Sequence, residues 1–336
     1  MLLKEFYTYD LGKIIKEIIS RKASKVLLQL PNGIKRFSRE LISDIISNLR
    51  RSGYDKDITI DIDGNPIYGS CLIDLNLIRN YELVLHFAHE PYPYWEAPSN
   101  VVFIDLLSKA KPSNNTLEKL VRMLTEMNVK YLAIYITPQH KLIVSDIVKY
   151  LKSRDIMIIN RPKVITGCWF ADLDLFLDKV HAVLVIAGGM FHALGLGLRI
   201  KASKHVLVLD PYSDKVKDVT KDVVKVLKVR LWKISKALNA KSWLIIVGSA
   251  GQYRYTIIKE VTGILKKNNR NFHIVRTTYL THDILRNIDG SDIEAIIITS
   301  CPRLAIEDFT KYDKPVLTPG EVMYMFGLRE DYTYPW

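Results

Sequence analysis

Three cysteines are the residues whose chemistry is most distinctive in this 336-residue chain: Cys71, Cys168 and Cys301. They lie 97 and 133 residues apart, which matches neither a disulfide framework nor the closely spaced cysteine pairs of a zinc ribbon. Three thiolates suit a [4Fe–4S] cluster with one iron left open, because soft sulfur ligands favour iron–sulfur chemistry over Mg²⁺ or Ca²⁺. Three-thiolate zinc is a second hypothesis, and ordinary burial in the core is a third.

The elements that must position these cysteines follow a pattern that occurs three times. Each repeat begins with a short apolar run, predicted to be a strand buried on both faces, and continues into an amphipathic helix. The repeats start 105 and 111 residues apart, and the apolar runs are residues 26–30, 131–136 and 243–247. Further strands follow in each repeat, and the third repeat is preceded by a long helix predicted over residues 219–238. Alternating strands and helices predict parallel α/β sheets with right-handed crossovers.

We therefore predict three similar parallel-sheet α/β domains, arranged around a pseudo-threefold axis, with one cysteine in each. The predicted domains are residues 1–109 with Cys71, residues 110–212 with Cys168, and residues 213–336 with Cys301. Each cysteine follows a predicted strand, and open parallel sheets bind ligands at the carboxyl ends of their strands. The alternative is a single doubly wound sheet with accidental internal similarity.

Composition narrows the class of protein. The chain has 48 Lys and Arg against 36 Asp and Glu, a net charge of +12, and 48% hydrophobic residues, which excludes a disordered or collagen-like chain. Neither a membrane-spanning apolar run nor a secretory signal is recognisable, so we expect a cytoplasmic protein without membrane contact. The basic excess could steer an acidic protein partner or RNA, but because no RNA-recognition motif is present we expect no direct nucleic-acid binding.

Several motifs together resemble the archaeal diphthamide synthase subunit 2 family, over nearly the whole chain. In chain order they are KVLLQLPNGI from Lys25, YGSCLID from Tyr68, HFAHEPYP from His86, GGMFHALGL from Gly188, GSAGQYR from Gly248, SCPRLAIED from Ser300 and LTPGE from Leu317. One departure is Leu72, where members often carry a second cysteine. That second thiol is not expected to be a ligand.

The resemblance implies a fold, a cofactor and a reaction. Members are homodimers with three similar domains per subunit, and one cysteine from each domain binds a [4Fe–4S] cluster, so Cys71, Cys168 and Cys301 would be the ligands. S-adenosylmethionine, the cosubstrate, binds at the unique iron and is cleaved reductively to a 3-amino-3-carboxypropyl radical. That group is transferred to a histidine of translation elongation factor 2, the first step of diphthamide biosynthesis. No electron donor is predicted.

Other residues in these motifs could bind S-adenosylmethionine or adjust the cluster. Backbone N–H groups beside a cysteine could donate to cluster sulfur, glycines let the backbone approach a ligand, and an Arg fork suits a carboxylate. The candidates are Gly69, Ser70, Gly188, Gly189, Gln252, Arg254 and Arg303. Structural roles stay open for them, such as a turn at the glycine pair, a helix cap at Gln252 and an ion pair at Arg303. For His89 and His192 an ordinary role within their loops is favoured.

Two other functions remain open. A quinolinate-synthase-like enzyme also places three cysteines from three domains around a [4Fe–4S] cluster, but it acts on a small molecule. The motifs SCPRLAIED and LTPGE favour the diphthamide enzyme over it. A nonenzymatic basic module that binds a ribosomal or RNA partner would hold no cluster.

Overall fold

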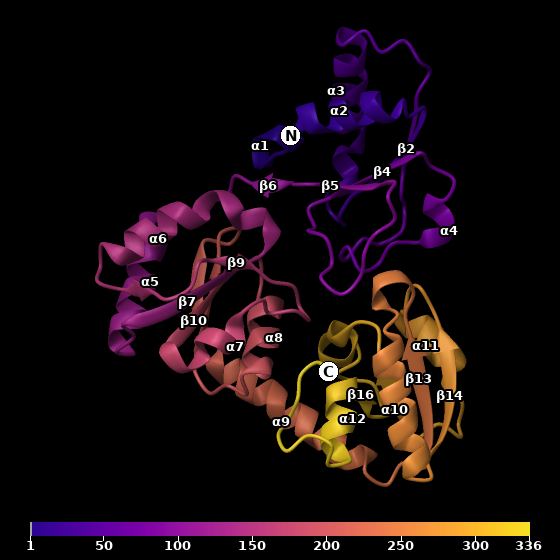
Figure 1. The fold of residues 1–336 in the computed structure, drawn as a ribbon. Helices are drawn as coiled ribbons and strands as arrows, with labels where there is room; N and C mark the ends of the chain where they lie inside the picture. The colour runs from indigo at the N-terminus through magenta and orange to yellow at the C-terminus, as the bar shows by residue number, and fades with distance from the viewer. Residues whose placement is uncertain (1) are drawn as a thin grey trace. The chain divides into compact units, whose positions relative to one another are not determined.

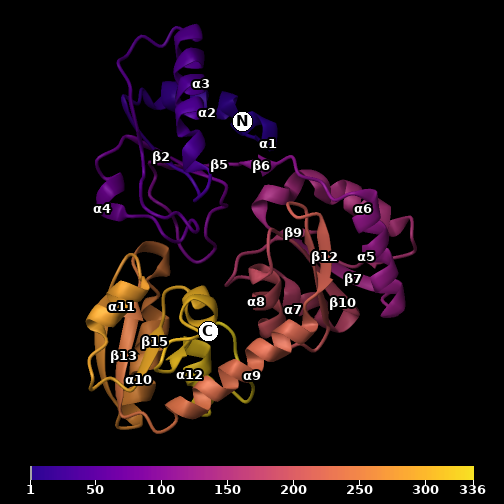
Figure 2. The same cartoon turned by 180° about the vertical axis from the view of Figure 1, so that it is seen from behind.

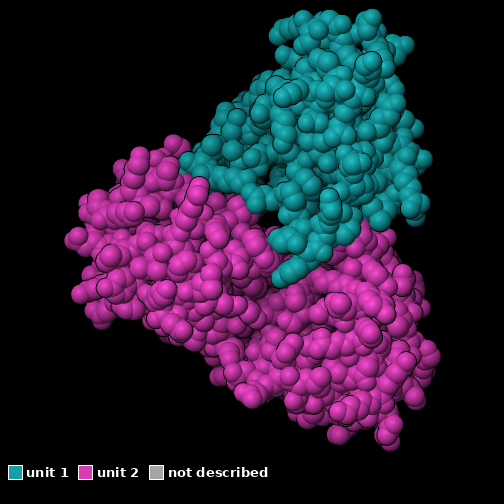
Figure 3. All heavy atoms as spheres, in the orientation of Figure 1, with its two compact units in different colours: residues 1–110, 138–143 teal, residues 111–137, 144–336 magenta. Residues whose placement is uncertain are grey.

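The computed structural model describes residues 2–336 and contains two compact units, shown in teal and magenta in Figure 3. Unit 1 consists of residues 1–110 and 138–143, and unit 2 of residues 111–137 and 144–336. Unit 1 holds one parallel α/β sheet, and unit 2 holds a second parallel sheet and one that is parallel except at its edge strand (Figures 1 and 2). The predicted α/β class is confirmed, and the alternative of one doubly wound sheet is wrong.

The sheet of unit 1 has four parallel strands in the order β3-β2-β4-β5. The strands are β2 (Lys25–Gln29), β3 (Thr59–Ile62), β4 (Leu83–Phe87) and β5 (Val101–Ile104), and a two-stranded ribbon joins β1 (Tyr7–Thr8) to β6 (Leu107–Ser108). The helices are α1 (Leu3–Phe6), α2 (Leu11–Arg21), α3 (Ser38–Arg51) and α4 (Leu75–Ile78), with 3₁₀ turns at Lys35–Phe37 and Pro138–Ile143. Ile14 and Ile18 of α2 and Leu41 of α3 are buried in the core on this sheet, as their helical spacing predicts.

The first sheet of unit 2 has the order β12-β11-β10-β7-β8, with β9 also paired to β7. Its strands are β7 (Tyr131–Ile136), β8 (Met157–Ile158), β9 (Lys163–Val164), β10 (Ala182–Ile186), β11 (His205–Asp210) and β12 (Lys215–Asp218). Its helices are α5 (Asn114–Glu126), α6 (Val144–Lys152), α7 (Leu173–Phe176) and α8 (Phe191–Arg199), with a 3₁₀ turn at Leu177–Lys179. All pairs are parallel except β11 with β12.

The second sheet of unit 2 has four parallel strands in the order β14-β13-β15-β16. They are β13 (Ser242–Val247), β14 (Asn271–Arg276), β15 (Ala295–Ile298) and β16 (Val316–Leu317). The helices are α9 (Thr220–Ala237), which leads from the first sheet into the second, then α10 (Tyr255–Lys267), α11 (His282–Ile288) and α12 (Pro319–Met325). A 3₁₀ turn at Ala250–Gln252 and a π-helical turn at Leu304–Asp308 complete this part.

The three sheets share a strand order, because the first strand of each repeat lies between the second and third. One contact also recurs: the backbone N–H at the start of the first strand donates to a side chain near the start of the third. The pairs are Ser24 with Glu82, Lys130 with His181, and Lys241 with Glu294. The predicted threefold repeat is therefore present as three sheets, while the division into three domains at residues 109/110 and 212/213 stays a prediction.

Candidate functional site

Cys71 lies in unit 1, in the loop between β3 and α4. The thiol is half-buried, and a Cβ added at Gly69 would lie 3.6 Å from its Sγ, so the backbone passes close to the sulfur. The buried Ser70 hydroxyl donates to the Glu90 carbonyl at 2.6 Å. Because Glu90 follows β4, this bond ties the Cys71 loop to the carboxyl edge of the sheet.

Cys168 lies in unit 2, between β9 and α7. The Thr166 hydroxyl accepts a hydrogen bond from the backbone N–H of Trp169 at 3.1 Å, so residues 166–169 form a tight turn. The same hydroxyl lies 3.6 Å from Cys168 Sγ, on the inside of this turn. Gly167 is required here, because an added Cβ would lie 2.2 Å from the Phe191 ring. Burial, together with the charge of Cys301, raises the pKa of the Cys168 thiol to about 12. The hydrogen bond with Thr166 acts in the opposite direction but is the smaller effect. A thiol in this setting becomes a thiolate when a metal binds it.

Cys301 lies in unit 2, three residues after β15, at the carboxyl end of a central strand. The buried Thr299 hydroxyl donates to the Ile246 carbonyl at 3.1 Å and holds the end of β15 against β13. The Cys301 carbonyl accepts from Leu304 N–H, which begins the π-helical turn. The thiol is half-buried, as the other two are.

Cys168 and Cys301 lie close enough for their charges to interact. Tyr334 lies near enough to both cysteines for its hydroxyl to interact with them electrostatically as well. The Tyr334 hydroxyl donates to the Gly167 carbonyl at 3.2 Å. Burial raises the pKa of Tyr334 well above its usual range, and negative charge on Cys168 and Cys301 adds to the effect. Tyr334 is not among the site residues predicted from sequence, because no local signal relates it to Cys168, 166 positions away.

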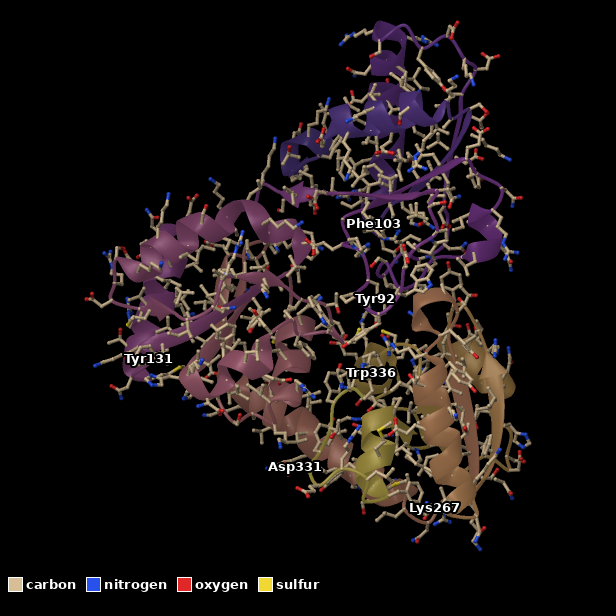
Figure 4. All side chains as sticks on the ribbon, viewed as in Figure 1. Tyr92, Phe103, Tyr131, Lys267, Asp331 and Trp336 are labelled. Atoms are coloured by element: carbon tan, nitrogen blue, oxygen red, sulfur yellow. The ribbon has the colours of Figure 1, made fainter. Side chains whose placement is uncertain are left out.

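The first loop of the third repeat carries Gln252 and Arg254. Gln252 is buried, and its side chain fills the space that a Cβ at Gly248 would occupy, next to Ser300. The Arg254 guanidinium lies over the ring of Trp336, 3.3 Å from its centroid; Trp336 is labelled in Figure 4. Gln252 thus lies next to Ser300, the residue before Cys301, and Arg254 lies against Trp336, two residues after Tyr334.

Arg303 has the ion pair that was one of its two predicted roles. Its Nε donates to Glu307 at 2.9 Å, Asp308 lies 3.8 Å away, and the guanidinium packs over the Phe191 ring at 5.7 Å. The same Phe191 ring contacts Gly167, so Arg303 lies on the Cys168 side of its loop. A bound carboxylate would compete with Glu307 for this guanidinium.

Gly188 and Gly189 follow β10 and form the turn that was their predicted structural role. Gly189 has a φ of +72°, which favours glycine, and its N–H donates to the Asp210 carboxylate at 3.1 Å. At Gly188 an added Cβ would lie 2.8 Å from the Tyr212 ring, so the backbone approaches this ring closely. The turn leads into α8.

Comparison with known proteins decides the family. Residues 30–336 match the model of the family described as "Putative diphthamide synthesis protein".

The chain belongs to this family. Among its relatives are 2-(3-amino-3-carboxypropyl)histidine synthases of two archaea. The Pyrococcus horikoshii protein is 27% identical over 96% of this chain and 92% of its own length. The Methanocaldococcus jannaschii protein is 25% identical over 98% of this chain and 92% of its own length.

Solved structures show the same fold. The crystal structure of Dph2 from Pyrococcus horikoshii with a 4Fe-4S cluster has a TM-score of 0.81 and 24% sequence identity, and covers 98% of this chain and 94% of that one. A second crystal structure of Dph2 from the same organism has a TM-score of 0.82 over the same shares. The family identification and the α/β fold predicted from sequence are both confirmed.

Proposed function

We propose that this family member is a 2-(3-amino-3-carboxypropyl)histidine synthase, a transferase that carries out the first step of diphthamide biosynthesis. The observation that carries the proposal is the family match across residues 30–336, with relatives of that name aligned over nearly the whole chain. The enzyme would bind a [4Fe–4S] cluster and S-adenosylmethionine and transfer the 3-amino-3-carboxypropyl group to a histidine of translation elongation factor 2. We further infer that it acts as a homodimer in the cytoplasm.

Cys71, Cys168 and Cys301 are the proposed cluster ligands, one from each proposed domain around the pseudo-threefold axis. Their soft thiolates fit iron–sulfur chemistry, and each lies in a loop that follows a strand of its own sheet. The electrostatic interaction between Cys168 and Cys301 supports a shared centre. Bound there, the cluster would supply the low-potential electron for reductive cleavage of S-adenosylmethionine.

The chain's other candidate residues would orient S-adenosylmethionine and surround the cluster. Backbone groups of Gly69, Ser70, Gly188 and Gly189 are proposed to approach the bound groups, and the side chains of Gln252, Arg254 and Arg303 to hold the polar ends of the cosubstrate. The stacking of Arg254 on Trp336 supports this role, because it fixes the plane of a guanidinium that can bind a carboxylate through two hydrogen bonds.

The function is tested with anaerobically purified, reduced protein supplied with S-adenosylmethionine, with and without elongation factor 2. We expect methylthioadenosine as the small product and a 3-amino-3-carboxypropyl group on one histidine, detected by mass spectrometry. Formation of 5′-deoxyadenosine in its place would show that a different bond is cleaved. A protein that binds iron but leaves S-adenosylmethionine intact would contradict the proposal as well.

The ligand assignment predicts that Cys71→Ala, Cys168→Ala and Cys301→Ala each lose the cluster, because each thiolate holds one iron and the fourth iron has no protein ligand. Iron content and the visible absorption band measure the loss after anaerobic purification. His273→Gln is a matched control, because His273 is an exposed residue of β14. Wild-type iron content and spectrum in Cys168→Ala would show that the ligand set is incorrect.

A further inference from the structure

A hydrogen-bonded row of four polar side chains crosses the carboxyl edge of the sheet in unit 1. Gln29 Nε2 donates to Asp63 Oδ2 at 3.0 Å, Gln29 Oε1 lies 2.9 Å from His86 Nδ1, and His86 Nε2 lies 3.0 Å from His89 Nδ1. Asp63, Gln29 and His86 are buried, and His89 is half-buried. The ring of Phe103, labelled in Figure 4, packs edge-on against His86.

The row fixes the orientation of each group in it. Asp63 accepts from Gln29 and, through Oδ1, from the N–H of Asn65, so the Gln29 amide must direct its NH₂ group toward the carboxylate. Gln29 Oε1 then faces His86 and can only accept, which places a proton on His86 Nδ1. Burial lowers the pKa of His86 well below its usual range, and His89 adds to this, so the ring is neutral and its Nε2 bears a lone pair.

The position of the proton on His89 follows from its hydrogen bond to His86. His86 Nε2 can only accept, so His89 Nδ1 carries the proton between the two rings. Burial lowers the pKa of His89 to about 4, so this ring is neutral too. The single proton is therefore on Nδ1, and Nε2 is left as a hydrogen-bond acceptor.

His89 lies in a loop that is hydrogen-bonded to the loop of the proposed cluster ligand of unit 1. His89 lies two residues after β4, and the next residue, Glu90, accepts the hydrogen bond from Ser70 that ties down the Cys71 loop. Ala88, which precedes His89, has a φ of +68°. Non-glycine residues adopt this left-handed conformation at a cost, and such strain clusters at functional sites.

We propose that His89 is a substrate-contacting residue whose Nε2 accepts a hydrogen bond from an N–H group of a substrate. The inference rests on the proposed function, which supplies two such donors: the α-ammonium group of S-adenosylmethionine and the imidazole N–H of the acceptor histidine. A neutral acceptor held in one tautomer adds no charge to the site and needs no reorganisation when the substrate binds. Asp63, Gln29 and His86 are the positioning residues that hold this tautomer.

The tautomer is tested by NMR on the full-length, metal-free protein labelled with ¹⁵N-histidine, with His89→Gln to assign the signals. We expect His89 to be neutral at pH 7, with its proton on Nδ1 and an unprotonated Nε2. A charged His89, or a ring protonated on Nε2, would overturn the inference before any activity is measured.

Contact with substrate is tested with a matched pair of variants in the reconstituted enzyme. His89→Gln keeps an acceptor oxygen near the position of Nε2, whereas His89→Leu has a similar volume and no acceptor. We expect His89→Leu to raise either the Kd for S-adenosylmethionine or the KM for elongation factor 2 about tenfold, and His89→Gln to restore most of the loss. The constant that changes identifies which substrate supplies the donor.

Failure of the inference is distinguishable from failure of the proposed function. If wild-type enzyme forms methylthioadenosine and both His89 variants match it in Kd and KM, His89 does not contact substrate. If both variants are equally impaired, the side chain has a merely structural role and the inference is wrong. An inactive wild-type enzyme contradicts the proposed function instead, and the NMR measurement still decides the tautomer.

Discussion

Tyr332 and Tyr334, near the end of the chain, support two different parts of unit 2 through their hydroxyl groups. The Tyr332 hydroxyl donates to Glu321 Oε1 at 2.9 Å, and Glu321 is fully buried in an ion pair with Arg230. The Tyr334 hydroxyl donates to the neutral carbonyl of Gly167. The two bonds therefore differ mainly in the charge of the acceptor.

Tyr334→Phe and Tyr332→Phe form a matched pair that measures this difference. We expect Tyr334→Phe to lower the free energy of unfolding by about 1 kcal/mol, and Tyr332→Phe by about 1.5–3 kcal/mol because its acceptor is charged. Both variants keep the buried ring, so packing is retained. Urea denaturation checks the values, and an equal or reversed order would show that the Glu321 bond is not the stronger one.

His86 and His89 should make the stability of unit 1 depend on pH. The folded-state pKa of each lies below the unfolded value of about 6.5, so the unfolded chain binds more protons as the pH falls. Stability is fully present above pH 6.5 and decreases below it, for His89 until about pH 4.

We expect the free energy of unfolding to fall between pH 6.5 and 5.5 by up to about 1.4 kcal/mol per pH unit for each of these histidines. Urea denaturation across this pH range measures the slope. His89→Gln should reduce the slope by up to about one bound proton. An unchanged slope in His89→Gln would mean that His89 takes up its proton equally in both states.

At the scale of elements, helices α8 and α9 approach closely because Gly197 has no side chain. An added Cβ at Gly197 would lie 2.3 Å from Cγ2 of Val223, which is fully buried and β-branched and so cannot move aside easily. Gly263, in α10, is also within a helix but is exposed, and a Cβ added there would have no neighbouring atom within 4 Å.

Gly197→Ala should therefore destabilise the protein by about 1–3 kcal/mol through overpacking. The control Gly263→Ala should stabilise it by about 0.5–1 kcal/mol, because alanine loses less backbone entropy in a helix. Thermal or urea unfolding compares the two variants. A gain in stability at both positions would show that α8 and α9 can separate without cost.

At the scale of the whole molecule, the two sheets of unit 2 share one hydrophobic core. Val183 and Leu196 from the first sheet and its helix belong to the same buried cluster as Trp243 and Ile245 from the second. Arg230 of α9 is also buried, and its guanidinium bonds to Glu321 beside the second sheet.

The Arg230 guanidinium forms a fully buried ion pair with Glu321 of α12 at 2.6 Å and donates to the carbonyls of Ala305 and Val316. Because α9 runs from the first sheet into the second, this ion pair anchors the connection between them. We infer that the two sheets unfold together.

Hydrogen exchange resolved by peptide tests this cooperativity. We expect Gly197→Ala, which lies on the first sheet's side, to lower the opening free energies of β7 and β13 by the same amount. Strand β2 is the internal reference, because unit 1 has a core of its own. A decrease at β7 with β13 unchanged would mean that each sheet is a separate folding unit, as the sequence-based domain boundaries predict.

The sequence by itself determined the class of fold and its threefold repetition, because both depend on the local spacing of apolar residues. Strands predicted at residues 131–136 and 243–247 are β7 and β13, and the helix predicted at 219–238 is α9. Strand β12 was missed because its sequence, KVKD, is short and charged, as suits an edge strand.

Only the tertiary structure decided which distant polar groups meet. The pairing of Tyr334 with Gly167, of Arg230 with Glu321, and of His86 with Gln29 joins residues far apart in the chain. Such contacts have no periodic signal, since each depends on how buried faces pack rather than on local sequence. The sequence could place a cysteine after a strand in each repeat, but the tyrosine beside Cys168 and the oriented histidine pair required the folded chain.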